Sequence, residues 1–154
     1  MNNIFFYQTA IGEIGIAENG GSITNLFFAK EQIPRNNIIF ETGILKEAAR
    51  QLQGYLAGQL KEFDLPLALG GTEFMRRVWK SLLNIPYGET RSYQEIALSV
   101  GNKNASRAVG HACKQNPIPV IIPCHRVIGA NGKLTGFGGG LDLKAHLLDL
   151  EKTK

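Results

Sequence analysis

The pattern of apolar residues changes near residue 70, and this change is the strongest limit on how the chain can fold. Before it, three short β-rich segments, 4–7, 12–16 and 23–28, are separated by turns, and Asn19-Gly20-Gly21 is a hairpin turn signal. From Thr72 onward apolar residues recur at helical spacing instead. Because strand-like segments and helical spacing occupy separate parts of the chain, the sequence predicts two parts of different architecture.

The first part also contains one helical segment. Apolar residues between Glu41 and Leu60 follow the spacing of one helix face, at 44, 45, 48, 49, 52, 55 and 56. The strands and this helix together predict a small α/β lobe over residues 1–66. A connection to the second lobe is predicted at about 67–71, which contains Gly70-Gly71. The second lobe is predicted over residues 72–154.

Helix boundaries in the second lobe are marked by short local signals. A helix lined by Phe74, Val78, Trp79, Leu82 and Leu83 is predicted to stop at residues 85–88. Ser92 and Glu95 fit a capping box that opens a helix over 93–100, which ends at Gly101. Another helix over 105–115 follows a tight turn, so the pair resembles a helix-turn-helix. An amphipathic helix is predicted over 141–152.

Composition argues against several classes of protein. The uncharged stretch 115–125 holds three prolines and, like every other uncharged run in the chain, is too short to span a bilayer. No basic stretch followed by an apolar run opens the chain, so we expect no secretory signal. We therefore expect a cytoplasmic or nucleoid-associated protein. The chain has two cysteines and three histidines, with no HExxH or CxxC spacing, so we expect no metal site. A disulfide is not expected in a reducing compartment.

Charge is distributed unevenly between the two parts. Residues 1–71 hold five Lys/Arg and seven Asp/Glu, whereas residues 72–154 hold twelve and six. The second part is therefore basic, and a polyanion such as nucleic acid is a candidate partner for it.

The stretch from Asn116 to Val127 carries the clearest chemical signal. Three apolar β-branched residues lead into Pro123-Cys124-His125-Arg126, so the cysteine lies where a buried strand-like segment stops. A nearby His⁺ or Arg favours the nucleophilic thiolate, although sequence neighbours need not face the same way. An inert buried thiol is the alternative interpretation.

The segment Ile122-Pro123-Cys124-His125-Arg126-Val127 resembles the active-site signature of the methylated-DNA–protein-cysteine methyltransferases, the O6-alkylguanine-DNA alkyltransferase family. Further matches in family order and spacing cover residues 72–151 closely; they are Pro86-Tyr87-Gly88-Glu89, Ser92-Tyr93, Ala105–Gly110, Asn116-Pro117-Ile118-Pro119, Gly139-Gly140-Leu141, Lys144 and Leu147-Leu148 with Glu151. The first lobe agrees only in length and general character.

The resemblance implies a role for each matching position. Cys124 would accept the alkyl group irreversibly, and His125 would take the thiol proton through a water, oriented by Glu151. Asn116 would hold the turn before the active-site strand, while Tyr93 and Lys144 would assist the departing guanine. The reaction would need no cofactor.

The resemblance also implies how DNA is bound. A slim helix would enter the minor groove, and Arg107 would fill the gap left by the extruded nucleotide. The implied DNA-binding residues are Tyr93, Ala105, Ser106, Arg107, Ala108 and Gly110, and the implied base-pocket residues are Val127, Gly136, Gly138, Gly139 and Gly140. Small residues on that helix are equally explained by close packing against another helix.

The implied fold is α+β, with an N-terminal α/β lobe containing a small antiparallel sheet and a mainly helical C-terminal lobe with a winged-helix-like helix-turn-helix. The expected substrate is O6-alkylguanine in double-stranded DNA, with O4-alkylthymine left open, and the expected state is a monomer. The alternatives are a non-catalytic alkyltransferase-like sensor, a cysteine hydrolase and a helix-turn-helix transcription factor. The presence of Cys124 opposes the first alternative, because those relatives replace the cysteine.

Overall fold

The computed structural model describes residues 1–28, 33–34 and 36–152. The chain divides into two compact units, Met1–Leu69 and Gly70–Lys154. The end of the predicted second lobe, residues 153–154, lies outside the described residues.

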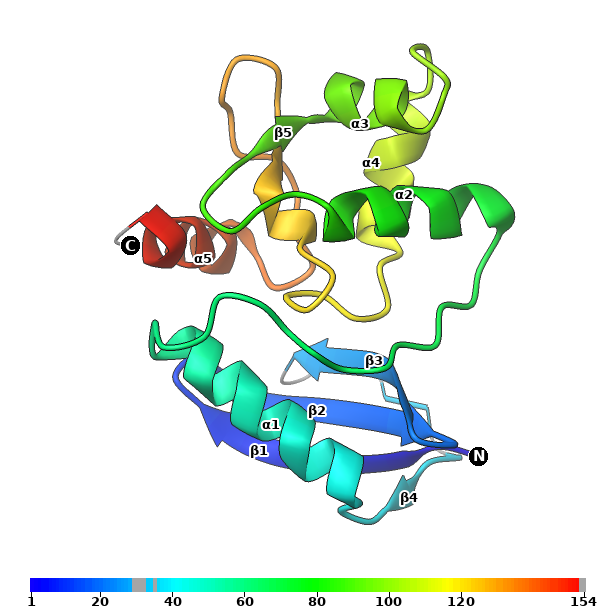
Figure 1. Ribbon diagram of the computed structural model, residues 1–154, viewed down its shortest axis with the longest axis vertical. Coiled ribbons are helices and arrows are strands. Elements are labelled where there is room, and N and C mark those ends of the chain that lie inside the picture. The colour runs from blue at the N-terminus through cyan, green and yellow to red at the C-terminus, as the bar shows by residue number, and fades with distance from the viewer. Residues whose placement is uncertain (29–32, 35, 153–154) are drawn as a thin grey trace. The chain divides into compact units, whose positions relative to one another are not determined.

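The first unit is built on a four-stranded sheet in the order β3-β2-β1-β4 (Figure 1). Its strands are β1 (Asn3–Thr9), β2 (Gly12–Asn19), β3 (Ser22–Phe28) and β4 (Ile38–Ile39). Neighbouring pairs β1–β2 and β2–β3 are antiparallel, as predicted, whereas the unpredicted two-residue strand β4 runs parallel to β1. Strand β2 is interior, and Ile14 to Glu18 along it are buried.

The predicted hairpin turn at residues 19–21 is confirmed. Gly20 and Gly21 have φ angles of +62° and +90°, and the turn connects the register pair Asn19–Ser22. Two consecutive positive φ angles match the handedness of a tight hairpin, and glycine adopts them without steric cost.

Helix α1 (Gly43–Leu56) is shorter than the predicted segment over 41–60. Thr42 caps its start by accepting a hydrogen bond from the Leu45 backbone N–H, and Glu41 instead accepts one from the Tyr7 hydroxyl at 2.8 Å. Its end is set by Gly58, which has φ +76°. The buried face of the helix packs on β1, β2 and β3.

Residues 66–68 form hydrogen bonds with β3 before the chain leaves the first unit. The Ile23 N–H donates to the Pro66 carbonyl and the Ala68 N–H donates to the Ile23 carbonyl, both at 2.8 Å. Leu67, predicted within the connection, therefore forms a bridge with Ile23.

Three helices form the centre of the second unit (Figure 1). They are α2 (Glu73–Leu83), α3 (Tyr93–Ser99) and α4 (Ser106–Lys114). The predicted capping box of α3 is present, since Ser92 and Glu95 exchange side-chain and backbone hydrogen bonds. The Trp79 indole N–H donates to the Ala112 carbonyl at 2.8 Å and so attaches α2 to α4.

The remaining elements of this unit surround the cysteine. A 3₁₀ turn, η1 (Cys124–Arg126), leads into β6 (Val127–Ile128), which pairs in parallel with β5 (Arg91–Ser92). Helix α5 (Leu141–Lys152) has the predicted bounds and packs against η1. Among residues 1–28, 33–34 and 36–152, every helix is too short or too polar to cross a bilayer.

Candidate active site

The turn that presents Cys124 is held by Asn116. Its amide donates to the Ile122 carbonyl and its carbonyl oxygen accepts from the Ile118 N–H, each at 2.9 Å. Between these contacts, buried Val120 has a φ of +74°. A β-branched residue is strained in this region by about 1–3 kcal/mol, so the surrounding bonds must hold the turn in place.

Cys124 is a buried, protonated thiol in the resting protein. Only 6% of the residue is exposed, and burial raises the pKa of the thiol to about 11. A hydrogen bond from Asn116 and the charge of Lys144 act in the opposite direction on that pKa. The side chains of His125 and Arg126 both bond to Glu151, an arrangement that the resemblance implied for His125 but not for Arg126.

Reaction of Cys124 with iodoacetamide should therefore rise about tenfold per pH unit from about pH 7 to about pH 10. Only the thiolate reacts, and because the raised pKa of about 11 keeps its fraction small, each unit of pH increases that fraction proportionally. Timed alkylation read by peptide mass spectrometry checks this slope. A rate that levels off near pH 8.5, as for a free cysteine peptide, would contradict the burial argument.

His125 is fully buried and bonds to Glu151 through Nε2, with 2.8 Å between Nε2 and Oε2. Burial lowers the pKa of the imidazole, and the Glu151 charge only partly offsets this effect. Since an ionised carboxylate only accepts, Nε2 donates to Glu151 and the lone pair of the neutral ring lies on Nδ1. The histidine is therefore set up to receive a proton at Nδ1.

Arg126 holds Glu151 in place, a role that the sequence analysis missed. Its Nε and second terminal nitrogen donate to the two carboxylate oxygens at 2.9 and 3.0 Å, and its other terminal nitrogen donates to the Ile85 carbonyl at 2.7 Å. The Gly88 N–H donates to the same carboxylate at 3.1 Å. The sequence did offer a signal for this role, since an arginine inside an apolar segment is expected to be buried. A buried charge needs a partner of opposite charge.

Lys144 and Tyr93 flank the cysteine. The Lys144 ammonium is buried and donates to the carbonyls of Val127 at 2.7 Å and Thr135 at 3.2 Å. Burial lowers its pKa, while the neighbouring thiols act to raise it. Tyr93 shares a hydrogen bond with the Thr135 hydroxyl, and burial raises the pKa of its phenol.

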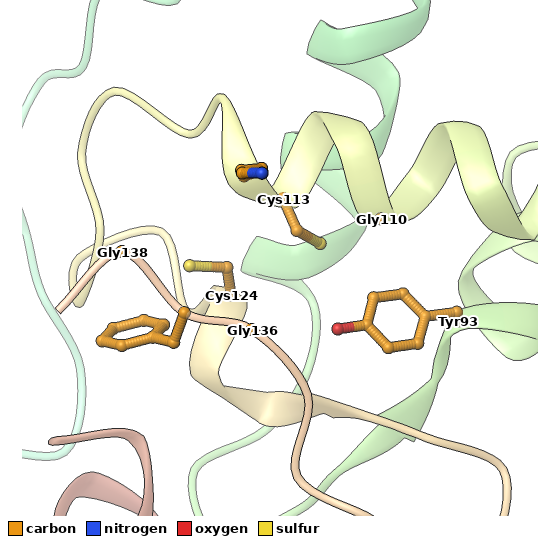
Figure 2. A pocket seen from close by; sticks show the side chains of 8 residues that line it. Tyr93, Gly110, Cys113, Cys124, Gly136 and Gly138 are labelled. Carbon is orange, nitrogen blue, oxygen red and sulfur yellow. The ribbon is translucent and has the colours of Figure 1, made fainter. Parts of the chain in front are cut away.

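A pocket of about 390 Å³ opens onto Cys124. Figure 2 shows the Tyr93 hydroxyl pointing toward the part of the pocket where Cys113 and Cys124 lie. The lining residues are Tyr93, Gly110, Cys113, Lys114, Cys124, Gly136, Phe137 and Gly138. Largely apolar walls with a few polar groups are typical of a small-molecule pocket.

The predicted pocket residues are only partly brought together. Gly136 and Gly138 line the pocket, whereas Val127, Gly139 and Gly140 are not among the described lining residues. The Val127 side chain is buried in the core and its carbonyl accepts from Lys144. Gly140, with φ +95°, directly precedes α5, and its carbonyl accepts from the Lys144 N–H.

Three lining residues, Cys113, Lys114 and Phe137, were missed from the sequence. The first two follow Gly110 on α4 by three and four residues, which places them on the same helix face. This spacing was a usable signal once Gly110 was assigned to the site.

Helix α4 exposes a narrow basic face. Arg107, Ala108, His111 and Lys114 are exposed, while Ser106 and Gly110 are half-buried. Ala105, predicted to bind DNA, is only 8% exposed because it begins the helix against the core, so its side chain is not on this face. His111 and Lys114, which lie four and seven residues after Arg107, share its face of the helix and were not among the residues predicted for that face.

Both units of the chain match the domains of one protein family. Residues 73–153 match the DNA binding domain of 6-O-methylguanine DNA methyltransferase, and residues 5–69 match its ribonuclease-like domain. A methylated-DNA–protein-cysteine methyltransferase of Mycobacterium tuberculosis is 51% identical over 149 residues, covering 96% of this chain and 90% of the relative. The constitutive enzyme of that name from Bacillus subtilis is 46% identical over 159 residues, covering 99% and 96%.

A solved structure agrees over nearly the whole chain. The crystal structure of Mycobacterium tuberculosis OGT in complex with DNA has a TM-score of 0.93 and 49% identity, and the match covers 98% of this chain and 93% of that one. With both family domains matched in order and relatives near half identity over at least nine tenths of their lengths, the chain belongs to the 6-O-methylguanine DNA methyltransferase family.

Proposed function

We propose that this protein repairs DNA by direct reversal, transferring the alkyl group of O6-alkylguanine irreversibly to Cys124. The observation that carries the assignment is the pocket at Cys124, with the buried His125–Glu151 pair next to the acceptor in the chain. O4-alkylthymine remains a second candidate substrate.

The reaction is a displacement at the alkyl carbon. The sulfur of Cys124 forms a bond to that carbon while the bond from carbon to O6 breaks, and the electron pair of the broken bond stays on the purine. The thiol proton passes through a water to His125, whose basic Nδ1 and Glu151 contact suit it to receive charge. The products are an S-alkyl cysteine and guanine.

Tyr93 and Lys144 assist the leaving base in this proposal. The phenol gives its proton to a guanine ring nitrogen as negative charge develops there. The buried Lys144 ammonium, whose charge also acts on the Cys124 thiol, stabilises negative charge beside the pocket. Asn116 holds the turn that presents the thiol. Because a thioether carbon is a poor electrophile, no hydrolytic step regenerates the thiol, and each molecule reacts once.

The exposed face of α4 is proposed to enter the minor groove of double-stranded DNA. Its alanine and glycine allow close approach, and Arg107 fills the gap left by the flipped nucleotide. Flipping is needed because O6 is inaccessible within a stacked duplex. Tyr93, Ser106, Ala108 and Gly110 complete the proposed DNA-binding set.

Arg107→Ala should weaken binding to undamaged duplex several-fold and lower the salt slope of the binding constant by about 1, because the DNA-facing surface of α4 loses one positive charge that displaces counterions. Fluorescence anisotropy over a salt series measures both quantities. Arg50→Ala removes an exposed arginine of the first unit, paired with Glu47, and should leave the slope unchanged. Equal slopes for the Arg107 variant and the parent protein would remove Arg107 from the interface.

Further expectations complete the proposal. The acceptor lobe spans 72–154 and the N-terminal lobe 1–66, joined at about 67–71; the protein works as a monomer without a cofactor, in the cytoplasm or on the nucleoid. A transcription factor would read the major groove with polar side chains, few of which α4 offers. A cysteine hydrolase would leave the helix-turn-helix unexplained.

Intact and peptide mass spectrometry after mixing with excess duplex containing O6-methylguanine tests this function. One methyl group per protein, mapped to Cys124, with guanine left in the DNA, is the expected result. Binding without any gain in mass would indicate a non-catalytic sensor, and neither binding nor mass gain would overturn the proposal.

A further inference from the structure

Thr135 contacts two of the side chains proposed to assist the leaving base. Its hydroxyl shares a hydrogen bond with the Tyr93 hydroxyl, and its backbone carbonyl accepts from the Lys144 ammonium at 3.2 Å. It also directly precedes the pocket-lining segment Gly136–Gly138. One loop residue therefore connects a wall of the pocket to α3 and α5.

The direction of the bond between the two hydroxyls decides what Tyr93 can do. Each hydroxyl has one proton, and the phenol proton stays near the plane of its ring. If Thr135 donates, the Tyr93 proton points away from Thr135 and is available to a base in the pocket. If Tyr93 donates, its proton is occupied by Thr135 and must be released before catalysis.

We infer that Thr135 is a positioning residue whose hydroxyl donates to the Tyr93 oxygen and thereby leaves the phenol proton for the departing guanine. When the proton moves to the base, the O–H electron pair remains on the Tyr93 oxygen, which continues to accept the hydrogen bond from Thr135. This inference rests on the proposed function, since it concerns the leaving base of that reaction.

A donor at residue 135 also favours the ionised form of the Tyr93 phenol. Burial and the nearby thiols raise the pKa of Tyr93, whereas the hydrogen bond with Thr135 lowers it. A donor to the phenolic oxygen stabilises the phenolate that remains after proton transfer, and bonds to charged groups are the stronger ones. Thr135 is thus the neighbour that opposes the cost of burying an acidic tyrosine.

Substitution of the side chain isolates the hydroxyl from the backbone contact. Thr135→Val keeps the shape and the carbonyl that accepts from Lys144, but removes the donor. The single-turnover rate of methyl transfer should fall about tenfold, the effect of one hydrogen bond to a developing charge. Thr135→Ser should restore most of the rate, while binding to undamaged duplex stays within about twofold in both variants.

A double-mutant cycle with Tyr93→Phe separates positioning from loop structure. If Thr135 acts through the phenol, Thr135→Val has no further effect on rate once the phenolic hydroxyl is absent. If it only shapes the loop, the two losses multiply, and the inference fails. Thr135→Ala provides a second variant without the hydroxyl in case valine disturbs folding. Thr90→Val makes the same change at an exposed threonine and should leave the transfer rate unchanged.

The outcomes distinguish this inference from the proposed function. Absence of methyl transfer by the unmodified protein would overturn the function. Normal transfer by the parent with an equal or higher rate in Thr135→Val would leave the function intact and show that Tyr93 does not depend on a donor at residue 135.

Discussion

Cys124→Ala should abolish methyl transfer completely while duplex binding is retained. The substitution removes the proposed acceptor sulfur, and the basic face of α4 that we propose for DNA is formed by other residues. The remaining rate of methyl transfer should be too low to measure, because no other nucleophile is held at the position of the Cys124 sulfur. The measurement pairs mass spectrometry of the protein with anisotropy on the alkylated duplex.

Cys113 makes this experiment informative, because it lines the same pocket. Burial raises the pKa of the Cys113 thiol to about 12, so its thiolate is even scarcer than that of Cys124. We expect no methyl group at this position in the Cys124→Ala protein. Methylation there, or continued repair of the duplex, would show that Cys124 is not the obligatory acceptor.

Glu151→Ala should be the most destabilising substitution in the site, lowering the free energy of unfolding of the second unit by about 3–5 kcal/mol. The carboxylate is buried and accepts from His125, Arg126 and Gly88. Without it, the Arg126 guanidinium remains buried without its compensating charge. Urea unfolding followed by the fluorescence of Trp79, the one tryptophan, reports on this unit.

An exposed ion pair provides the matched control. Arg91 and Glu89 are 3.0 Å apart, with 35% and 53% of their side chains exposed, so Glu89→Gln should change the free energy of unfolding by less than about 0.5 kcal/mol. In Glu151→Gln, which keeps the shape, transfer should slow by about 100-fold or more because the base loses its orienting charge. Similar free energies of unfolding for Glu89→Gln and Glu151→Ala would contradict the stabilising role given to the buried Glu151 carboxylate and its partners.

Features that depend on neighbours in sequence could be predicted. The Gly20-Gly21 turn, the Ser92–Glu95 capping box and the bounds of α5 follow from local backbone preferences, which operate within a few residues. Helix ends depend on finer detail; α1 contains all the apolar positions of its pattern but is shorter than the segment 41–60, because Thr42 caps its start and Gly58 stops its end. Strand β4, with two exposed isoleucines, carries no amphipathic pattern to find.

The sequence by itself determined the chemical identity of the site. Pro-Cys-His-Arg at residues 123–126 and the matching motifs around it point to one family and to Cys124 as the acceptor. These residues are recognised by their types and by their order along the chain, both of which can be read without knowing the fold.

Only the tertiary structure decided which groups act on the cysteine. His125 and Arg126 are its sequence neighbours, but both bond to Glu151, whereas Lys144 and Asn116 lower the thiol pKa from more distant positions. Burial opposes them and prevails, because the cost of desolvating a charge is set by all the atoms packed around it. Packing of this kind brings residues far apart in the chain together, and no local pattern records it.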